Sequence, residues 1–131
     1  IHPGYMSLFS TWGAQDFAIE DGKLVCKLDS PEAIAMTDYW VNLIKTAGPP
    51  QWTNYTWYEA SSDLGAGKAA MMFDATSAAY FQNFAGASQE SGNISWSTIP
   101  LPEGKTEADM KANIRIWALA MNKDSKNKEA A

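Results

Sequence analysis

Two side chains near the end of the chain have types and spacing that suit a binding surface. Arg115 and Trp117 are two positions apart, so a strand over residues 114–121 would place both on one face. A guanidinium in a largely apolar strand is costly unless it is paired or faces a cavity. We therefore expect Arg115 to meet either a ligand or an acidic partner such as Asp74 or Asp109.

A carboxylate stands at a second position that is typical of ligand sites. Asp74 ends an apolar run that predicts a buried strand, and a predicted helix begins near Thr76. Ligands of open α/β sheets bind at strand ends. The Asp74 carboxylate would accept hydrogen bonds from ligand hydroxyls, or it would cap the helix by accepting backbone N–H groups. These two roles are compatible.

Tryptophan is the third signal, because the chain has six of them. An indole offers an apolar face and one N–H donor, which suits the C–H face of a sugar or polyol. Trp40 and Trp96 lie in patterns that favour core packing. Three others adjoin glycine or polar loop residues and are site candidates, with core packing as the competing role: Trp12, Trp57 and Trp117.

Composition excludes several function classes. The chain has 131 residues, enough for one domain, and its net charge of −5 argues against a nucleic-acid partner. With one cysteine, Cys26, and one histidine, His2, it can form neither an intrachain disulfide nor a Cys/His zinc site. No apolar run is long enough to span a bilayer. We expect no metal and no cofactor.

The elements that must position these side chains alternate between helix and strand. A β-hairpin is expected around Asp21-Gly22, and Ser30-Pro31-Glu32 is a strong helix start. Buried strands between helices indicate an α/β protein. The expected helices cover residues 5–14, 31–45, 57–66, 76–84 and 122–128, the hairpin covers 17–28, and the strands cover 68–74, 94–99 and 114–121.

Several motifs occur in an order that resembles the family 1 extracellular solute-binding proteins, the periplasmic sugar or polyol receptors of bacterial ABC importers. They span nearly the whole chain. The motifs are Trp12-Gly13, Asp21-Gly22-Lys23, Asp29-Ser30-Pro31-Glu32-Ala33, Leu64-Gly65-Ala66-Gly67-Lys68-Ala69-Ala70-Met71-Met72, Ile99-Pro100-Leu101-Pro102-Glu103-Gly104, Trp117-Ala118-Leu119-Ala120-Met121 and Ser125-Lys126-Asn127-Lys128-Glu129-Ala130-Ala131.

The resemblance implies a fold and partners. Residues 1–131 would form a single domain, most of the C-terminal lobe of a type II periplasmic-binding-protein fold with a mixed sheet flanked by helices. The partners would be a small sugar or polyol, the missing N-terminal lobe and the membrane permease of an ABC importer. The protein would be periplasmic or extracellular, lipid-anchored in a Gram-positive organism, and it would bind without catalysis.

The resemblance also implies where the ligand binds. The family's contact positions map onto Tyr5, Trp12, Trp57, Asp74, Arg115 and Trp117. Many relatives have Gly-Gly at Trp12-Gly13 and a glycine pair at Arg115-Ile116, so this chain carries more bulk and more donors there. The stretch Phe73-Asp74-Ala75-Thr76, together with Trp117, is similar to the polyol-binding branch of mannitol or sorbitol type.

Two other functional classes stay open. A carbohydrate-active enzyme of glycosidase type would use acidic residues near Asp74, and it needs two carboxylates on either side of one bond. No second acid presents itself at a comparable strand end. A carbohydrate-binding module is usually all-β, and the helix start at Ser30-Pro31 argues against that class.

Overall fold

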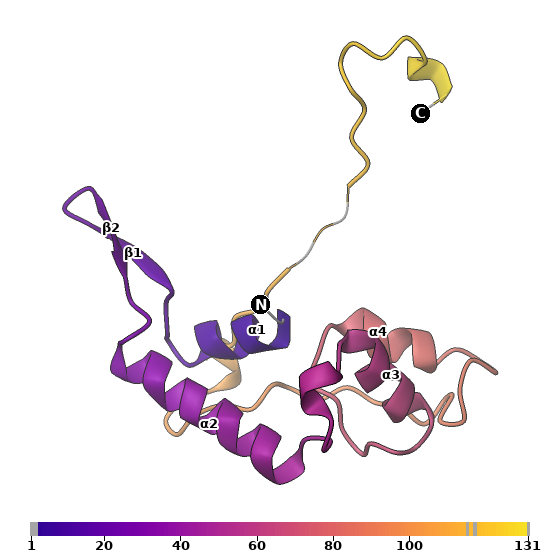
Figure 1. Cartoon of the computed structure of the whole chain (residues 1–131), viewed down its shortest axis with the longest axis horizontal. Coiled ribbons are helices and arrows are strands. Elements are labelled where there is room, and N and C mark those ends of the chain that lie inside the picture. Colours follow the sequence, from indigo (N-terminus) through magenta and orange to yellow (C-terminus); the bar gives the residue numbers. More distant parts are fainter. Residues whose placement is uncertain (1–2, 115, 117, 131) are drawn as a thin grey trace.

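The first half of the chain folds as a short helix, a β-hairpin and a long helix (Figure 1). The computed structural model describes residues 3–114, 116 and 118–130. The hairpin extends to the left of the helices in Figure 1. The elements are α1 (Pro3–Thr11), β1 (Phe17–Glu20), β2 (Lys23–Cys26) and α2 (Pro31–Ala47).

The long helix α2 begins where its sequence signals predict. The Ser30 hydroxyl accepts a hydrogen bond from the Ala33 N–H at 3.3 Å, and Pro31 occupies the first turn, where no N–H donor is needed. The helix ends at Gly48, whose N–H donates to the Ile44 carbonyl at 3.0 Å. The predicted helix start is therefore confirmed.

The hairpin also forms through contacts between residues that are close in the sequence. Its strands pair antiparallel, with Ala18 opposite Val25 and Ile19 opposite Leu24. Asp21 has φ 51° and Gly22 has φ 73°, and an Asp-Gly pair tolerates this left-handed turn better than other dipeptides. The predicted hairpin is confirmed.

The second half contains two packed helices. The Ser61 hydroxyl on α3 donates to the Ala78 carbonyl on α4 at 2.8 Å. A Cβ at Gly65 would lie 2.9 Å from Ser88 Cβ, so only glycine allows this approach. The elements are η1 (Trp52–Asn54), α3 (Trp57–Gly65), α4 (Thr76–Gln82), η2 (Glu107–Asp109) and η3 (Lys128–Ala130).

The core lies between α1 and α2. Half-buried aromatic rings pack against it and join it to residue 73, ahead of α4. No helix among the described residues is long and apolar enough to cross a membrane. The buried members of the core are Leu8, Phe9, Ala14, Ala33 and Met36, and the rings packed on them are Tyr5, Trp12, Tyr39, Trp40 and Phe73.

Among the described residues, the predicted buried strands are not formed. Residues 68–74 and 94–99 pair with no neighbouring strand, nor do the described residues of 114–121, so the described part of the chain has one two-stranded sheet instead of the expected mixed sheet. A strand is held by hydrogen bonds to a neighbour, and an apolar run alone cannot supply that neighbour. Met71 and Leu119 are consequently exposed.

The end of the chain also differs from the prediction. A helix was expected over residues 122–128, but the only helical turn after Met121 in the described residues is η3 (Lys128–Ala130). In Figure 1 this segment extends away from the helices. An isolated single turn fixes several dihedral angles for few hydrogen bonds, so helix formation there gains little without packing.

Candidate functional site

Tyr5 lies on α1 with its ring in the core and its hydroxyl at the surface. The ring stacks on Phe9 with centroids 5.6 Å apart and meets the edge of Trp40 at 5.8 Å. The hydroxyl is 3.1 Å from Thr37 Oγ1 on α2. Tyr5 therefore has a fixed ring and a hydroxyl that can exchange hydrogen bonds with a ligand.

Trp12 directly follows α1 and is half-buried. Its ring lies 5.0 Å from that of Tyr39, and its Nε1 donates a long hydrogen bond of 3.4 Å to the Pro100 carbonyl. Both ring faces of an indole are apolar, so a partly exposed Trp12 combines core packing with an available surface. The core and site interpretations of Trp12 are thus compatible.

Asp74 is joined to the same region through its neighbour Phe73. The Phe73 ring meets Trp40 at 5.8 Å with a 63° angle between the planes. We call Tyr5, Phe9, Trp12, Tyr39, Trp40 and Phe73 the aromatic cluster. Asp74 directly follows Phe73 in the chain and is half-buried.

The Asp74 carboxylate contacts the start of the following helix. The N-cap residue of α4 is Ala75, whose own side chain makes no capping hydrogen bond. Asp74 Oδ1 accepts the N–H of Ala75 at 2.5 Å. The helix-cap and ligand-binding roles of Asp74 both stay predictions.

Trp57 lies at the start of α3, outside the aromatic cluster. It is the first residue of α3 and 55% exposed, and among the described residues its ring meets that of Tyr58, 5.8 Å away. Around it, the Thr56 N–H and hydroxyl both bind the Glu59 carboxylate, and these hydrogen bonds lower the pKa of Glu59. Trp57 is thus held at a well-capped helix start.

The loop before Trp57 is fixed by a second polar contact. The Tyr55 hydroxyl donates to Asp63 Oδ2 at 2.5 Å, and this hydrogen bond raises the pKa of Tyr55. Lys68 Nζ lies 3.6 Å from the other Asp63 oxygen. The contacts tie the loop to the last turns of α3.

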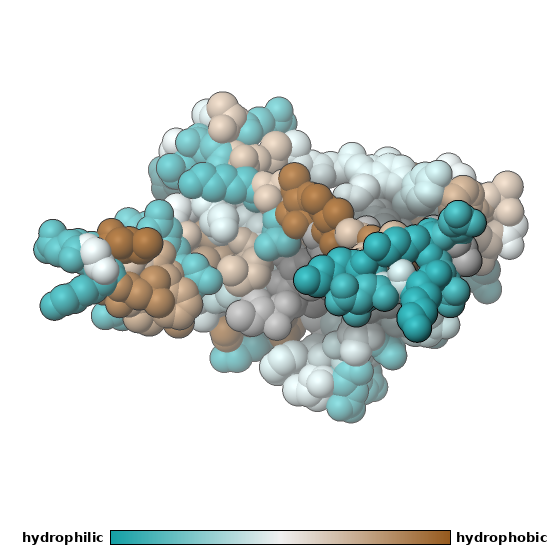
Figure 2. Space-filling model, turned by 90° about the horizontal axis from the view of Figure 1, so that it is seen from above, coloured by the Kyte–Doolittle hydropathy of each residue, from teal (hydrophilic) through white to brown (hydrophobic). Residues whose placement is uncertain are grey.

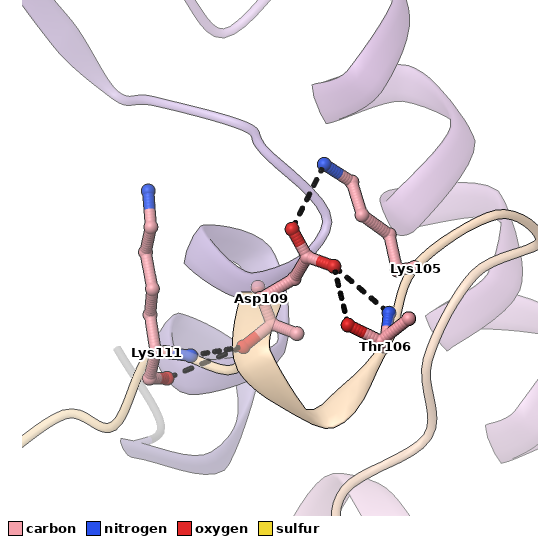
Figure 3. A network of polar contacts seen from close by, with 5 residues as sticks. Lys105, Thr106, Asp109 and Lys111 are labelled. Carbon is pink, nitrogen blue, oxygen red and sulfur yellow. Dashed lines mark hydrogen bonds and ion pairs between the residues drawn. The ribbon is translucent and has the colours of Figure 1, made fainter.

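Arg115 and Trp117 lie outside the described residues, but the segment that leads to them is well defined. Asp109 Oδ2 accepts hydrogen bonds from the Thr106 N–H at 2.8 Å and from its hydroxyl at 3.1 Å, and Lys105 Nζ lies 3.7 Å from Oδ1 (Figure 3). These hydrogen bonds lower the pKa of Asp109. Asp109 therefore closes the turn that begins at Thr106.

Sequence reasoning missed the hydroxyls of α1 that hold this segment. The Thr11 hydroxyl accepts the Lys111 N–H at 2.9 Å, and the Ser7 hydroxyl accepts the Asn113 N–H at 3.0 Å. Ser7 and Thr11 are four residues apart, so they share a helix face. That spacing was the one available signal, and it is weak because many helices carry such pairs.

The surface outside the aromatic cluster has other apolar parts. Figure 2 shows apolar surface on the β-hairpin, at the left of the view, where Ile19 and Leu24 are mostly exposed. Trp96, predicted as core, is half-exposed. Within the described ranges, no group of three or more His, Cys, Asp or Glu side chains is placed to hold a metal ion.

Comparison with known proteins gives one family. The family model described as bacterial extracellular solute-binding protein matches residues 2–131. The erythritol/L-threitol-binding protein of Mycolicibacterium smegmatis (strain ATCC 700084 / mc(2)155) is 41% identical over 128 residues. That match covers 98% of this chain and 26% of the relative, so the chain spans about a quarter of the relative's length. No solved structure matches the chain significantly.

Proposed function

The chain belongs to the bacterial extracellular solute-binding proteins, and from this membership we propose that it forms part of the substrate receptor of an ABC importer for sugars or polyols. The receptor binds its ligand and releases it unchanged, so it is not an enzyme. It works outside the cytoplasmic membrane, in the periplasm or, in a Gram-positive organism, as a lipid-anchored protein. Its partner is the membrane permease.

The proposed ligand is a small polyol. The observation that carries this proposal is the 41% identity, over nearly the whole chain, to a protein named for erythritol and L-threitol. The chemistry of the candidate residues supports it. A polyol is neutral and covered with hydroxyls. A hydroxyl can donate to a carboxylate or accept from a guanidinium, and both hydrogen bonds are stronger than those between neutral groups.

Each candidate residue would have its own role in ligand binding. The Asp74 carboxylate accepts ligand hydroxyls, Arg115 donates through its planar fork, and Tyr5 does either. Trp12 and Trp117 supply apolar faces for the C–H groups of the ligand. Trp57 would reach the ligand from the start of α3, outside the aromatic cluster.

We propose that residues 1–131 are a single domain forming most of the C-terminal lobe. An N-terminal lobe would then supply the opposite wall of the cleft, and the receptor would close on its ligand between the two. The share of the relative that the match covers, 26%, supports this division. A polyol held by one wall alone would make only part of its hydrogen bonds.

The test is a binding experiment on the intact protein that carries this chain. Calorimetry with erythritol, L-threitol, mannitol and sorbitol should show binding of at least one polyol, with a melting temperature that rises with ligand concentration. Chromatography of the ligand after incubation should return it unchanged. Failure to bind any polyol or sugar of a wider panel would refute the proposal, and turnover of the ligand would favour the glycosidase-type alternative.

A further inference from the structure

The two faces of the β-hairpin differ in chemistry. Residues directly opposite each other in an antiparallel pair share a face, and so do residues two positions apart along one strand. One face therefore carries two opposing pairs, Phe17 with Cys26 and Ile19 with Leu24. We call these four residues the hairpin patch. Three of them are large apolar side chains, and a free cysteine behaves as a small apolar one.

The hairpin patch is exposed although its residues are apolar. The exposed fractions are 78% for Ile19, 71% for Leu24 and 52% for Phe17, and Cys26 is also exposed. On the opposite face, by contrast, Val25 is half-buried. Figure 2 shows the apolar surface of the hairpin at the left of the view. Within the described part of the chain, the larger apolar side chains of the hairpin are thus the ones turned to solvent.

The hairpin that displays the patch has a defined local structure. Its turn at Asp21-Gly22 is left-handed, and the Lys27 N–H donates to the Asp16 carbonyl at 2.9 Å next to the paired strands. Glu20, which lies on the face opposite the patch, forms an ion pair with Lys27. These contacts fix the register of the strands and leave the patch uncovered. A two-stranded hairpin is marginally stable in water unless it packs against other strands or a helix.

We propose that the hairpin patch is an internal interface, covered by an apolar surface of the same polypeptide outside residues 1–131. The match to the erythritol/L-threitol-binding protein covers 26% of that protein, so about three quarters of a receptor of that length could supply the cover. A segment of the same polypeptide is present at a high effective concentration, so its packing costs less entropy than the binding of a separate molecule. The inference rests on the proposal that this chain is one part of a longer receptor, not on the identity of the ligand.

Two other occupants fit the patch less well. A second copy of the chain would bring together two molecules that each carry a net charge of −5, and such like charges favour the monomer. A membrane permease meets its receptor only for part of the transport cycle, so the patch would face water for the rest of it. An exposed apolar surface of this kind promotes association. Both occupants are distinguished by the test below.

Cys26 reports on the cover, because this thiol belongs to the patch. The intact protein is treated with iodoacetamide under native conditions and in denaturant, and alkylation of the peptide containing Cys26 is followed by mass spectrometry. Each rate is divided by that of glutathione in the same buffer. We expect alkylation to be about tenfold slower, or more, in the native protein, because a covered thiol reacts only through local opening. Similar rates in the two conditions would overturn the inference, since a patch left free for a permease gives that result.

Dilution distinguishes an internal cover from a second copy. The native rate is measured again after dilution by about two orders of magnitude, because association depends on concentration and packing within one polypeptide does not. We expect the protection of Cys26 to be unchanged. Protection that is lost on dilution, with a dimer seen by size-exclusion chromatography at the higher concentration, would overturn the inference.

A pair of variants tests the apolar contact itself. Ile19→Thr keeps a β-branched side chain in the strand but places a hydroxyl in the patch. We expect a lower melting temperature and about fourfold or more faster alkylation of Cys26, the effect of losing one buried methylene group. The control is Lys23→Thr, which places the same residue at an exposed position on the opposite face and should change neither readout. An Ile19→Thr protein that behaves like Lys23→Thr would overturn the inference, and if Ile19→Thr does not fold, the wild-type alkylation still decides.

Polyol binding by the same preparation separates this inference from the proposed function. An intact protein that binds a polyol while Cys26 reacts freely overturns the inference alone. An intact protein that protects Cys26 and binds no polyol or sugar supports the inference and refutes the proposed ligand class.

Discussion

Replacement of Asp74 by asparagine is the sharpest test of the candidate site. The two side chains have nearly the same shape, so Asp74→Asn removes the charge and little packing. Asp74 Oδ1 accepts the Ala75 N–H at 2.5 Å, and the amide oxygen of asparagine can still accept this bond. Because the replacement keeps this hydrogen bond at the start of α4, we expect only a small change in the melting temperature.

Asp74→Asn replaces the charged acceptor of the ligand hydroxyls with a neutral one, and the expected loss of affinity follows from this change. A hydrogen bond to a charged group is worth about 1.5–3 kcal/mol and one to a neutral group about 0.5–1.5 kcal/mol, so the replacement costs about 1–1.5 kcal/mol. At about 1.4 kcal/mol per factor of ten, Kd for the polyol should rise about 5-fold to 12-fold. The assay is calorimetry on the intact protein at neutral pH.

The control for this variant is Asp38→Asn on the exposed side of α2. It makes the same change of net charge, so a long-range electrostatic effect would appear in both proteins, whereas a direct contact would appear in Asp74→Asn alone. Unchanged affinity in Asp74→Asn, with the polyol bound normally by the wild type, would refute the assignment of Asp74 to the site.

Two further predictions concern the last predicted strand and the start of α3. Trp117→Ala should weaken every polyol of similar shape, whereas Arg115→Lys should weaken selectively those held by its planar fork; calorimetry with a ligand panel checks both, and unaltered affinity would remove these residues from the site. The lowered pKa of Glu59 means that its contribution to stability is present above the unfolded-state pKa and lost as the pH falls through the folded-state value. The difference in melting temperature between wild type and Glu59→Gln should therefore shrink below about pH 4, and a constant difference would show that the Thr56 contact does not stabilise the charged form.

The features that were predictable from the sequence are those whose hydrogen bonds close within a few residues. The turn at Asp21-Gly22 and the capped start at Ser30 depend on the chain immediately around them. Family membership was also readable, because the ordered motifs extend over the whole chain and the family model matches residues 2–131.

The strands were not predictable, because an apolar run specifies burial but not a partner. Residues 68–74 have the composition of a buried strand, and yet their backbone pairs with no strand among the described residues. A ladder needs a second chain segment at about 4.8 Å, and local sequence says nothing of where that segment lies.

The arrangement of the candidate site was decided by tertiary contacts. Tyr5 and Phe73 each pack on Trp40, and this shared neighbour links the segment that carries Asp74 to α1. The contact from Thr11 to Lys111 joins residues that are 100 positions apart. These contacts form because α1 buries its apolar face against α2, which leaves its hydroxyls directed at the backbone of residues 111–113. Which backbone lies there depends on the whole fold and not on any single segment.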